Sequence, residues 1–443
     1  MEIHLMKRTV FSLAWLALAG ALSATAYAES LEDAWQAALS ASHPLRADHY
    51  RIEAAREDVR AAEAAGRPKL DLQGSWTALD DEPRARVDLS PFRRGPLAAV
   101  VPGSLEVPLA DNSLALAQAK VSLPVYTSGR LDALRDAARL AEAATAHGTD
   151  RTRLDVKLQV AETYFAVLRA QEARQVAAQY LDSLTAYRRD VGNFHSQGLV
   201  PRGDVLGADV ALADARQKVI AADEAFRVAS AAYNRLLGRP FDQPVRLDDR
   251  GLPREMRRYE DLVQLAGKRR PELAALSARS QALQARSRSV RAEGGPQVGV
   301  FASYQYLDHP ALVKKGIAAA GIGVEWAVFD SGLTRARAAS VAREAEAAQE
   351  ERDDAESLIR LDVRQALSQE NDAAERLKVA EAALASADEY LLIQRDRYAN
   401  GLASQTEVLT AEARRAESRR NLFNARYDHA LAVYRIRRAT GEL

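Results

Sequence analysis

The 443-residue sequence contains no cysteine. This absence excludes disulfide bonds, thiolate metal sites, a cysteine nucleophile and a lipid-modified N-terminal cysteine. Charge of one sign is also lacking, because basic and acidic residues number 61 each, so no net field draws the chain toward nucleic acid. Local basic pairs such as Arg414-Arg415 lie between Glu412 and Glu417, which is typical of a solvated helix face. We therefore expect no nucleic-acid partner.

The sequence shows none of the catalytic, metal-binding or cofactor-binding motifs that we looked for. The seven histidines show no metal-ligand spacing. No nucleophile elbow, phosphate-binding loop or dinucleotide fingerprint occurs in a strand–turn–helix setting. The carboxylates are spread along helical segments, where pairing with bases four residues away is their ordinary role. The sequence predicts that the protein is not an enzyme and has no metal and no cofactor.

Long apolar runs are absent except at the N-terminus. There Lys7 and Arg8 precede the apolar stretch 10–24, and Ala26-Tyr27-Ala28 forms a small-x-small cleavage site before Glu29. The stretch is shorter than the roughly 20 residues that a membrane-spanning helix needs. We predict a signal peptide over 1–28 and a mature chain that is periplasmic, secreted or in the outer membrane of a Gram-negative cell.

The remaining sequence repeats itself at a constant offset of 203 residues. The matches keep this offset over more than half of a 203-residue unit, and a constant offset over such a length predicts a duplicated structure. We place the first repeat at 29–238, a linker at 239–258 and the second repeat at 259–443. The clearest matches pair 123–129 (LPVYTSG) with 326–332 (WAVFDSG), Gln197-Gly198-Leu199 with Asn400-Gly401-Leu402, and Leu237-Gly238 with Thr440-Gly441.

Each repeat carries two runs of alternating polar and apolar residues, at 68–77, 114–123, 296–306 and 317–328. In the first run Leu70, Leu72 and Trp76 share one face, opposite Lys69 and Asp71. Such alternation predicts strands. Their length suits both a tilted strand that crosses a bilayer and a half-buried strand of a soluble sheet. Four strands cannot close a membrane barrel, which needs about eight, so membrane strands would require several chains to share one barrel.

Helical segments account for most of the other residues. An Ala-rich helix is predicted over 30–65. The segments 129–195 and 332–398 contain no proline, and each predicts a helix of roughly 100 Å, although a break near Gly148 is allowed. Segments 201–237 and 404–439 each predict a second helix, antiparallel to the long helix before it. We therefore expect helix hairpins at 129–237 and 332–439 with coiled-coil packing. The five prolines within 80–112 predict a long loop between the first two strands.

In this order the elements resemble those of the TolC-type outer membrane efflux proteins, over residues 30–443. The most specific pieces are 124–129 (PVYTSG), 328–332 (VFDSG), 198–200 (GLV) with Asp204-Val205, and 397–401 (RYANG) with Val408-Leu409. The resemblance implies a mainly α fold with membrane β structure. In such a homotrimer, four strands per protomer complete a twelve-stranded outer-membrane barrel above a long α-helical coiled-coil periplasmic tunnel.

The same resemblance implies partners and a function. The tunnel would dock on a periplasmic adaptor (membrane fusion) protein and an inner-membrane ABC transporter or proton-driven pump, and outer-membrane lipid would surround the barrel. We expect a passive export channel of a tripartite system. The missing N-terminal cysteine favours type I protein secretion, because many pump-dedicated members carry a lipid there. Multidrug or metal efflux is the alternative, and a periplasmic coiled-coil scaffold without a pore is a remote one.

Three groups of candidate site residues follow from the resemblance, and the first two are the hairpin tips and the strand-to-helix junction. The hairpin tips would contact the adaptor; they are Gly198, Leu199, Val200, Gly401, Leu402 and Ala403. A plain helix–turn–helix connector explains the glycines but not the exposed apolar residue after them. The strand-to-helix junction would use Pro124 as a bend and Gly129 and Gly332 for their backbone freedom. The second repeat departs from the pattern, with Ala327 in place of the proline.

A channel gate forms the third group. Tyr398 matches the family's gate tyrosine, Asp204 its acidic partner on the first hairpin, and Glu407 an inner acidic residue of the second. Charges that ring a pore can select and gate. Ala403 stands where the best-known member has a gate arginine, and Thr410 where it has a second acidic ring, so we expect Arg202 or Arg397 to hold the closed state instead. A purely packing role for Tyr398 is the alternative.

Overall fold

A computed structural model describes residues 28–82, 84–93, 95, 99–100, 102–108, 112–249, 253, 257–308 and 313–443. The predicted signal peptide, apart from its last residue, lies outside these ranges. None of the described helices is both long and apolar enough to cross a bilayer. Two compact units emerge from the contacts. The hairpin unit comprises the chain up to Tyr50, His147–Ala274 and Asp353–Leu443, and the strand unit comprises Arg51–Ala146 and Ala275–Arg352. Each unit thus takes segments from both sequence repeats.

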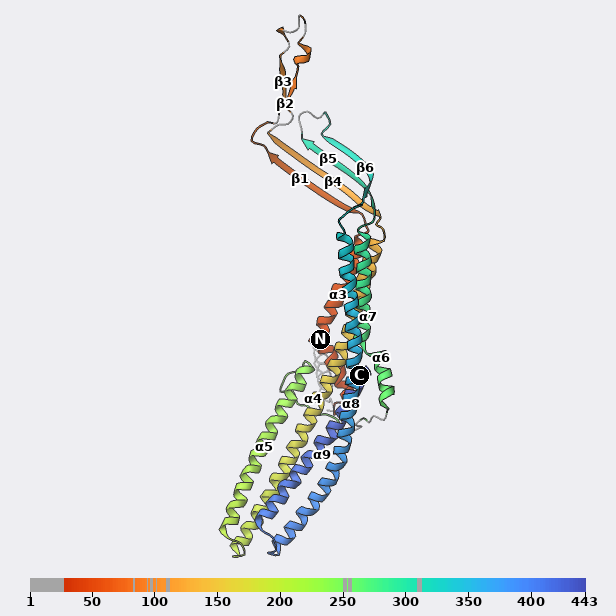
Figure 1. The fold of residues 1–443 in the computed structure, drawn as a ribbon. Coiled ribbons are helices and arrows are strands. Elements are labelled where there is room, and N and C mark those ends of the chain that lie inside the picture. The colour runs from red at the N-terminus through yellow and green to blue at the C-terminus, as the bar shows by residue number, and fades with distance from the viewer. Residues whose placement is uncertain are drawn as a thin grey trace, which may run out of the picture. The chain divides into compact units, whose positions relative to one another are not determined.

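The strand unit contains a four-stranded antiparallel sheet of order β1-β4-β5-β6 (Figure 1). Its strands are β1 (Lys69–Ala78), β4 (Ser113–Tyr126), β5 (Gln297–Asp308) and β6 (Gly316–Glu325). The central pairing of β4 with β5 joins the two repeats, with Ala119 opposite Tyr304. Because β1 and β6 each pair on one side only, both edges of this described sheet are open.

Strand bounds differ from the sequence prediction most clearly in β6. The run 317–328 was expected to be one strand, but β6 ends at Glu325. Trp326 Nε1 donates to the Gly294 carbonyl at 3.1 Å, and the Val328 amide donates to the Trp326 carbonyl at 3.1 Å. These bonds bend the chain away from the ladder, so the apolar alternation continues past the point where strand pairing stops.

The segment 80–112 contains a second, two-stranded sheet, which corrects its prediction as a loop. Strand β2 (Arg84–Asp88) pairs antiparallel with β3 (Ser104–Pro108), and a 3-10 turn η1 (Ser90–Phe92) lies between them. Pro108 is tolerated because it is the last residue of β3, opposite Arg84. Arg86 Nη2 donates to Glu106 at 2.9 Å across the pair. The prolines bound these short strands rather than preventing them.

The expected helix over 30–65 is two helices, α2 (Leu31–Ala41) and α3 (His43–Ala64). Ser42 between them is extended, and its hydroxyl accepts from the Leu45 amide at 3.3 Å, which starts the second helix. Pro44 has no amide hydrogen and so suits a first helical turn rather than a helix interior. The second repeat breaks in the same way at Arg270, between α6 (Tyr259–Arg269) and α7 (Pro271–Ala292).

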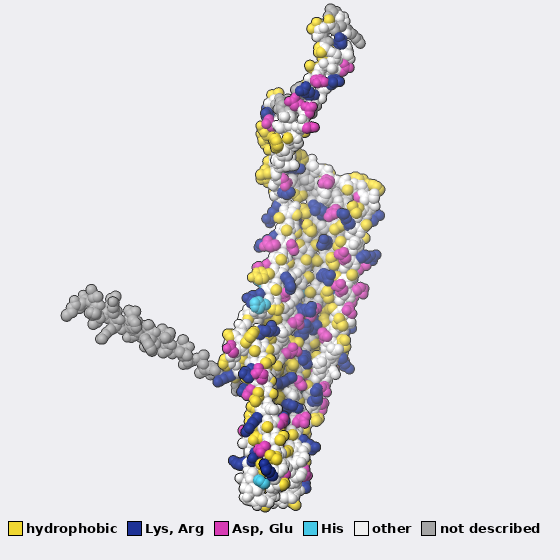
Figure 2. Space-filling view, turned by 90° about the vertical axis from the view of Figure 1, so that its left-hand side faces the viewer, with side chains coloured by type: hydrophobic (Ala, Val, Ile, Leu, Met, Phe, Trp, Pro, Cys, Tyr) yellow, Lys and Arg dark blue, Asp and Glu magenta, His cyan; other side chains and the backbone are white. Residues whose placement is uncertain are grey.

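Four long helices complete the chain: α4 (Arg130–Ser196), α5 (Arg202–Leu236), α8 (Leu333–Ala399) and α9 (Gln405–Thr440). In the hairpin unit they lie in the order α5, α4, α9, α8 (Figure 1). α4 runs unbroken through Gly148, so the break that the sequence allowed there does not occur. On the face seen in Figure 2, basic and acidic side chains are interspersed, in agreement with the balanced composition.

Aromatic side chains form the core of the hairpin unit. Phe165 of α4 lies 6.0 Å from the Tyr427 ring of α9, and Tyr164 packs edge-on against Tyr233 of α5. Trp35 Nε1 donates to the Lys157 carbonyl at 2.8 Å, which attaches α2 to α4. Such aromatic pairs contribute about 0.5–1.5 kcal/mol beyond their buried area. This core holds the two hairpins together and therefore positions their tips.

Candidate functional site

The two hairpin tips have the same backbone geometry. Gly198 and Gly401 have φ of 74° and 73°, values that favour glycine over residues with a Cβ. The amide after each glycine donates five residues back, from Leu199 to the Phe194 carbonyl at 2.9 Å and from Leu402 to Arg397 at 2.8 Å. Each tip is thus a Schellman motif that ends a long helix. The duplicated sequence predicted equivalent turns at these positions, and the structure contains them.

Apolar side chains follow the glycines and point into solvent. Leu199 is 67 % exposed and Leu402 is 68 % exposed. Val200 and Ala403 are half-buried, and Val200 packs against the apolar cluster beneath the tips. The structure therefore separates the predicted tip residues into one exposed leucine per hairpin and one inward neighbour. An exposed leucine at a turn costs solvation free energy in the isolated chain.

Beneath the tips, a tip cluster joins the two hairpins. Its buried members are Tyr187 and Val191 of α4, Ala208 of α5 and Val408 of α9. Tyr398 of α8 packs on it, with its ring centroid 5.7 Å from that of Tyr187. Its hydroxyl donates to Asp204 Oδ2 at 3.4 Å. Burial in this cluster raises the pKa of the Tyr398 hydroxyl, so the group stays protonated and can donate.

A second hydrogen bond links the same two hairpins. Gln405 Nε2, at the start of α9, donates to the Asp204 backbone carbonyl at 2.5 Å. Gly207 leaves room for this amide, because a Cβ built there would lie 3.0 Å from the Gln405 side chain. Asp204 therefore accepts from both α8 and α9, through its carboxylate and its carbonyl.

The other proposed gate charges do not join this contact. Glu407 turns toward its own helix end, where its carboxylate accepts from the Ser404 amide at 2.6 Å and the Ser404 hydroxyl at 2.9 Å. The Ser404 amide lowers the pKa of Glu407 most strongly. Arg397 Nη2 donates to the Leu402 carbonyl at 3.1 Å. Arg202 is exposed, and it forms no ion pair with a carboxylate of the described residues.

At the strand-to-helix junctions, pairs of residues adopt left-handed backbone. Ser128 and Gly129 have φ of 51° and 83°, and Ser331 and Gly332 have 53° and 86°. Asp330 stabilises the second junction by accepting from the Gly332 and Thr334 amides at 2.9 and 2.8 Å. Glycine suits the second position of each turn because it adopts such angles without a steric penalty, whereas Ser128 and Ser331 adopt them at a steric cost.

Pro124 lies inside β4, not in the turn. It pairs with Gly299, and the register shifts between Pro124 and Tyr126. The irregularity therefore directly follows the proline, and bulges of this kind bend the strand that carries the extra residue. The Ser128 hydroxyl donates to the Pro296 carbonyl at 2.7 Å and connects the first junction to the residue that precedes β5.

A buried carboxylate near the tips escaped sequence reasoning. Glu412 of α9 has a side chain only 2 % exposed. It accepts from the Ser183 hydroxyl of α4 at 3.0 Å and forms an ion pair with Arg395 of α8. In the sequence, Glu412 lies in a run of alternating charges that is typical of a solvated face. Only its partners on two other helices mark it as buried.

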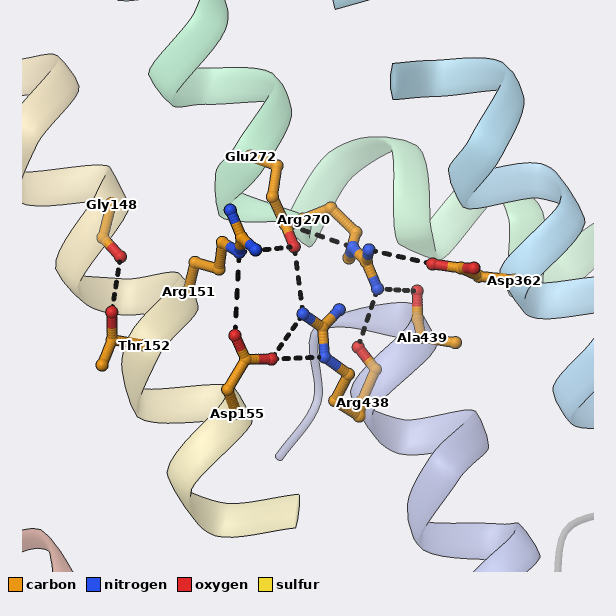
Figure 3. A network of polar contacts seen from close by, with 9 residues as sticks. All are labelled: Gly148, Arg151, Thr152, Asp155, Arg270, Glu272, Asp362, Arg438 and Ala439. Carbon is orange, nitrogen blue, oxygen red and sulfur yellow. Dashed lines mark hydrogen bonds and ion pairs between the residues drawn. The ribbon is translucent and has the colours of Figure 1, made fainter. Parts of the chain in front are cut away.

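A second charge cluster surrounds Arg270, at the break between α6 and α7 (Figure 3). Its side chain is 5 % exposed, with ion pairs to Glu272 at 3.1 Å and Asp362 at 3.3 Å. Arg438 of α9 contacts the same Glu272 at 3.2 Å and Asp155 of α4 at 2.6 Å. Burial, followed by the charge of Arg438, lowers the pKa of Arg270. Arg151 of α4 is a third cation near Glu272, at 3.9 Å. Glu272 of α7 therefore lies among three guanidinium groups and joins α7 to α4 and α9.

Acidic and histidine side chains do not converge on a metal site in the part of the chain that the structure describes. Among the described residues, the Glu412 and Arg270 networks contain buried charged groups, and these form ion pairs with each other. Such networks stabilise packing between helices. The arrangement that joins the two repeats at an exposed end is the tip cluster.

Known proteins share this fold and sequence pattern. The outer membrane protein TolC of Vibrio cholerae serotype O1 is 24 % identical over 439 residues, which covers 96 % of this chain and 93 % of TolC. The solved structure of VceC from Vibrio cholerae has a TM-score of 0.74 at 20 % identity, covering 93 % of this chain and 96 % of VceC. The CmeC outer membrane channel of Campylobacter jejuni has a TM-score of 0.73 at 16 % identity, with 93 % and 85 % covered.

The family match is extensive as well. Residues 34–239 and 262–442 match the outer membrane efflux protein family, in two segments that correspond to the two repeats. The resemblance found in the sequence is thereby confirmed. The four-stranded sheet and paired long hairpins agree with it. The chain belongs to the outer membrane efflux protein family.

Proposed function

We propose that three copies of this chain form an outer-membrane duct, each contributing four strands to a twelve-stranded barrel and two helix hairpins to a periplasmic tunnel. The observation that carries the proposal is the four-stranded sheet with two open edges and one exposed apolar face. Open edges are not tolerated in lipid, so neighbouring copies must pair with β1 and β6. In this arrangement, the signal peptide 1–28 is removed and the repeats 29–238 and 259–443 supply equivalent segments.

The two faces of the sheet support a barrel with its apolar face toward lipid and its polar face toward the lumen. Leu72, Trp76 and Tyr304 belong to its apolar face and are exposed in the single chain, as are Ile322 and Val324. Side chains of a strand alternate between faces, so polar residues such as Gln73 occupy the opposite one. A membrane barrel with a water-filled lumen has this pattern, apolar outside and polar inside. Aromatic residues on the outer face suit contact with lipid at the membrane interface.

At the tips, we assign Leu199 and Leu402 to contact with a periplasmic adaptor protein. Both side chains are exposed next to rigid turns, which present them with little loss of conformational entropy on binding. Gly198, Val200, Gly401 and Ala403 shape the same surface. Arg202 and Arg397 are close enough in sequence to supply its polar rim.

The contact between Tyr398 and Asp204 is assigned as the closing link of the duct. It joins the first hairpin to the second, so separating the hairpins must break it. Glu407 orders the N-terminus of α9 beside this link rather than joining it. Arg202 and Arg397 make no ion pair with Asp204 within the described chain, so a role for either in closure requires a neighbouring copy.

For cargo, we propose type I protein secretion, driven by an inner-membrane ABC transporter. The given sequence contains no cysteine, whereas many pump-dedicated members of the family carry a lipid on an N-terminal cysteine, and this difference supports the proposal. The second candidate is drug or metal efflux with a proton-driven pump. It is supported by the description of the matched family as outer membrane efflux proteins. In either case the duct itself is passive, and the energy comes from the inner-membrane partner.

Isolation of the full chain from outer-membrane fractions tests the duct. We expect trimers that dissociate only on heating in detergent and that form channels in planar bilayers. A soluble monomer without conductance would instead support the coiled-coil scaffold. Expression in a host that lacks its own duct separates the cargo classes, because a secreted toxin and restored drug or metal resistance are independent measurements.

A further inference from the structure

The polar face of the four-stranded sheet carries an ordered set of side chains. In register, Gln73 of β1 lies opposite Gln118 of β4, and Gln118 lies opposite Gln305 of β5. One row nearer the helices, Lys120 of β4 lies between Asp71 and Ser303. Since residues two apart share a face, the amide row and Lys120 are on the same side of the sheet.

Charges within the four strands are few and mostly neutralised. The strands contain Lys69, Asp71, Lys120, Asp308 and Glu325 as their charged residues. Lys69 pairs with Asp71 at 2.6 Å, and Asp308 pairs with Lys315. Lys120 and Glu325 form no ion pair within the described ranges. No carboxylate there lies within 4 Å of the Lys120 ammonium group, although Asp71 is its cross-strand neighbour.

An aromatic ring positions this unneutralised charge. Lys120 Nζ lies over the Phe301 ring, 5.6 Å from its centroid. Such a cation–π contact contributes about 0.5–1 kcal/mol at an exposed site and leaves the positive charge in place. The Phe301 ring in turn lies over Gly321, where an added Cβ would meet it at 3.2 Å. Glycine at 321 therefore permits the ring position that supports Lys120.

The surface around Lys120 is hollow and open. A cavity of ≈ 380 Å³ is lined by Lys120, Arg130 and Glu325 as its charged residues, together with Phe301 and the glycines 299 and 323. A Cβ at Gly323 would meet no atom within 4 Å, so no side chain of the described residues covers this part of the face. Arg130 Nε donates to Gln297 at 3.3 Å. Two cations and one anion give the hollow a net positive charge.

We propose that Lys120 gives the duct a preference for anionic permeants. The inference rests on the trimeric barrel proposed above, in which the polar face lines the lumen and three copies of Lys120 form a ring. A ring of like charges in a pore raises the local concentration of counter-ions and thereby selects among permeants. The hollow, with its phenyl ring beside an ammonium group, suits anions that also carry an apolar or aromatic part.

The test measures reversal potentials of the purified trimer in planar bilayers under a tenfold KCl gradient. Lys120→Met keeps the length of the side chain but removes its charge, and we expect the ratio of chloride to potassium permeability to fall about two- to threefold near 0.1 M salt, where the Debye length is about 10 Å. Lys120→Arg preserves the charge and should preserve the ratio. Glu325→Gln removes the anion of the same hollow and should raise it. At 1 M salt these differences should shrink, because screening acts over about 3 Å.

A second measurement uses the absence of cysteine from the chain. Lys120→Cys introduces a single thiol, to be modified in the open channel with a cationic or an anionic methanethiosulfonate reagent. The cationic reagent should restore the chloride preference and the anionic reagent should lower it further. Because each channel serves as its own reference before modification, a folding defect cannot imitate this result.

The two proposals fail in different ways. Absence of any channel activity from the unmodified trimer would overturn the duct itself. Channels of normal conductance whose permeability ratio is the same for Lys120→Met, Lys120→Arg and both modified thiols would overturn the assignment of Lys120 while leaving the duct intact. An inaccessible thiol at 120 would likewise exclude a lumenal position for this side chain.

Discussion

The hydroxyl of Tyr398 donates to the carboxylate of Asp204, with 3.4 Å between the oxygens, across 194 residues of sequence. One residue belongs to the second helix hairpin and the other to the first. The ring of Tyr398 also packs on the buried tip cluster, so the contact combines a packing role with a polar link. Both roles that the sequence allowed for Tyr398 are therefore compatible with one geometry.

Tyr398→Phe separates these roles, because it keeps the ring and removes the hydroxyl. A net hydrogen bond contributes about 1 kcal/mol, which corresponds to about a fivefold shift toward separated hairpins per chain. We expect higher single-channel conductance, with little further increase when Asp204→Ala is added. Tyr390→Phe, on the same helix under Arg414, is the matched control. Unchanged conductance in Tyr398→Phe would remove the gate assignment.

Glu412 and Arg395 should respond unequally to substitution. Arg395→Ala leaves a carboxylate that is 2 % exposed without its cation, at a cost of about 3 kcal/mol in the free energy of unfolding. Glu412→Gln leaves a guanidinium that is 45 % exposed and can be hydrated, so we expect a loss of only about 1 kcal/mol. Thermal unfolding of the purified protein measures both. Equal losses would show that Glu412 reaches water more readily than the structure indicates.

Glycine substitutions distinguish the turns from the helices. Gly401→Ala places a Cβ on left-handed backbone, which costs about 1–2 kcal/mol although no atom lies within 4 Å. Gly148→Ala, in the interior of α4, should instead stabilise the protein by about 0.5–1 kcal/mol. Opposite shifts in the unfolding midpoint are the expected result. A stabilising Gly401→Ala would contradict the Schellman turn.

The exposed leucines provide a binding test. Leu199→Asp combined with Leu402→Asp should weaken adaptor binding about tenfold or more, as expected when central apolar contacts are lost. Leu206→Asp changes a leucine of α5 that is also exposed and serves as the control. Affinity is measured by capture of a purified adaptor on the immobilised trimer. Equal weakening by all of these changes would indicate a general charge effect rather than a contact at the tips.

The second tip should respond to acid through Glu407. Hydrogen bonds from Ser404 lower the pKa of Glu407 below its ordinary value of 4.5. Stability from a carboxylate with a lowered pKa is present above that ordinary value and is lost as the pH falls through the folded pKa. Hydrogen exchange of peptides covering 400–410 should therefore accelerate below pH 4.5 relative to Glu407→Gln, which keeps the capping geometry without titrating. Identical profiles in the two proteins would exclude this role.

Much of the fold was predictable because its signals are local. Alternation at Leu70, Leu72 and Trp76 indicated a strand, and the absence of proline from 129–195 indicated a long helix, since both patterns depend on near neighbours in the chain. The duplication then made equivalent turns at Gly198 and Gly401 predictable. Strand β6 was predicted too long because apolar alternation persists in Trp326 and Val328 after pairing has ended.

The burial of Glu412 and Arg270, by contrast, follows from the packed helices alone. Each lies in a segment whose charge pattern is that of a solvated surface, and each is enclosed by helices distant in sequence. The same holds for Lys120, which has no carboxylate partner among the residues that the structure describes because of how β1 pairs with β4 and where Phe301 lies. Side-chain period and backbone preference are properties of a short stretch of sequence, whereas burial and charge pairing depend on which distant side chains surround a group. The repeat and its elements could therefore be read from the chain, and the pairing of its charges required the assembled structure.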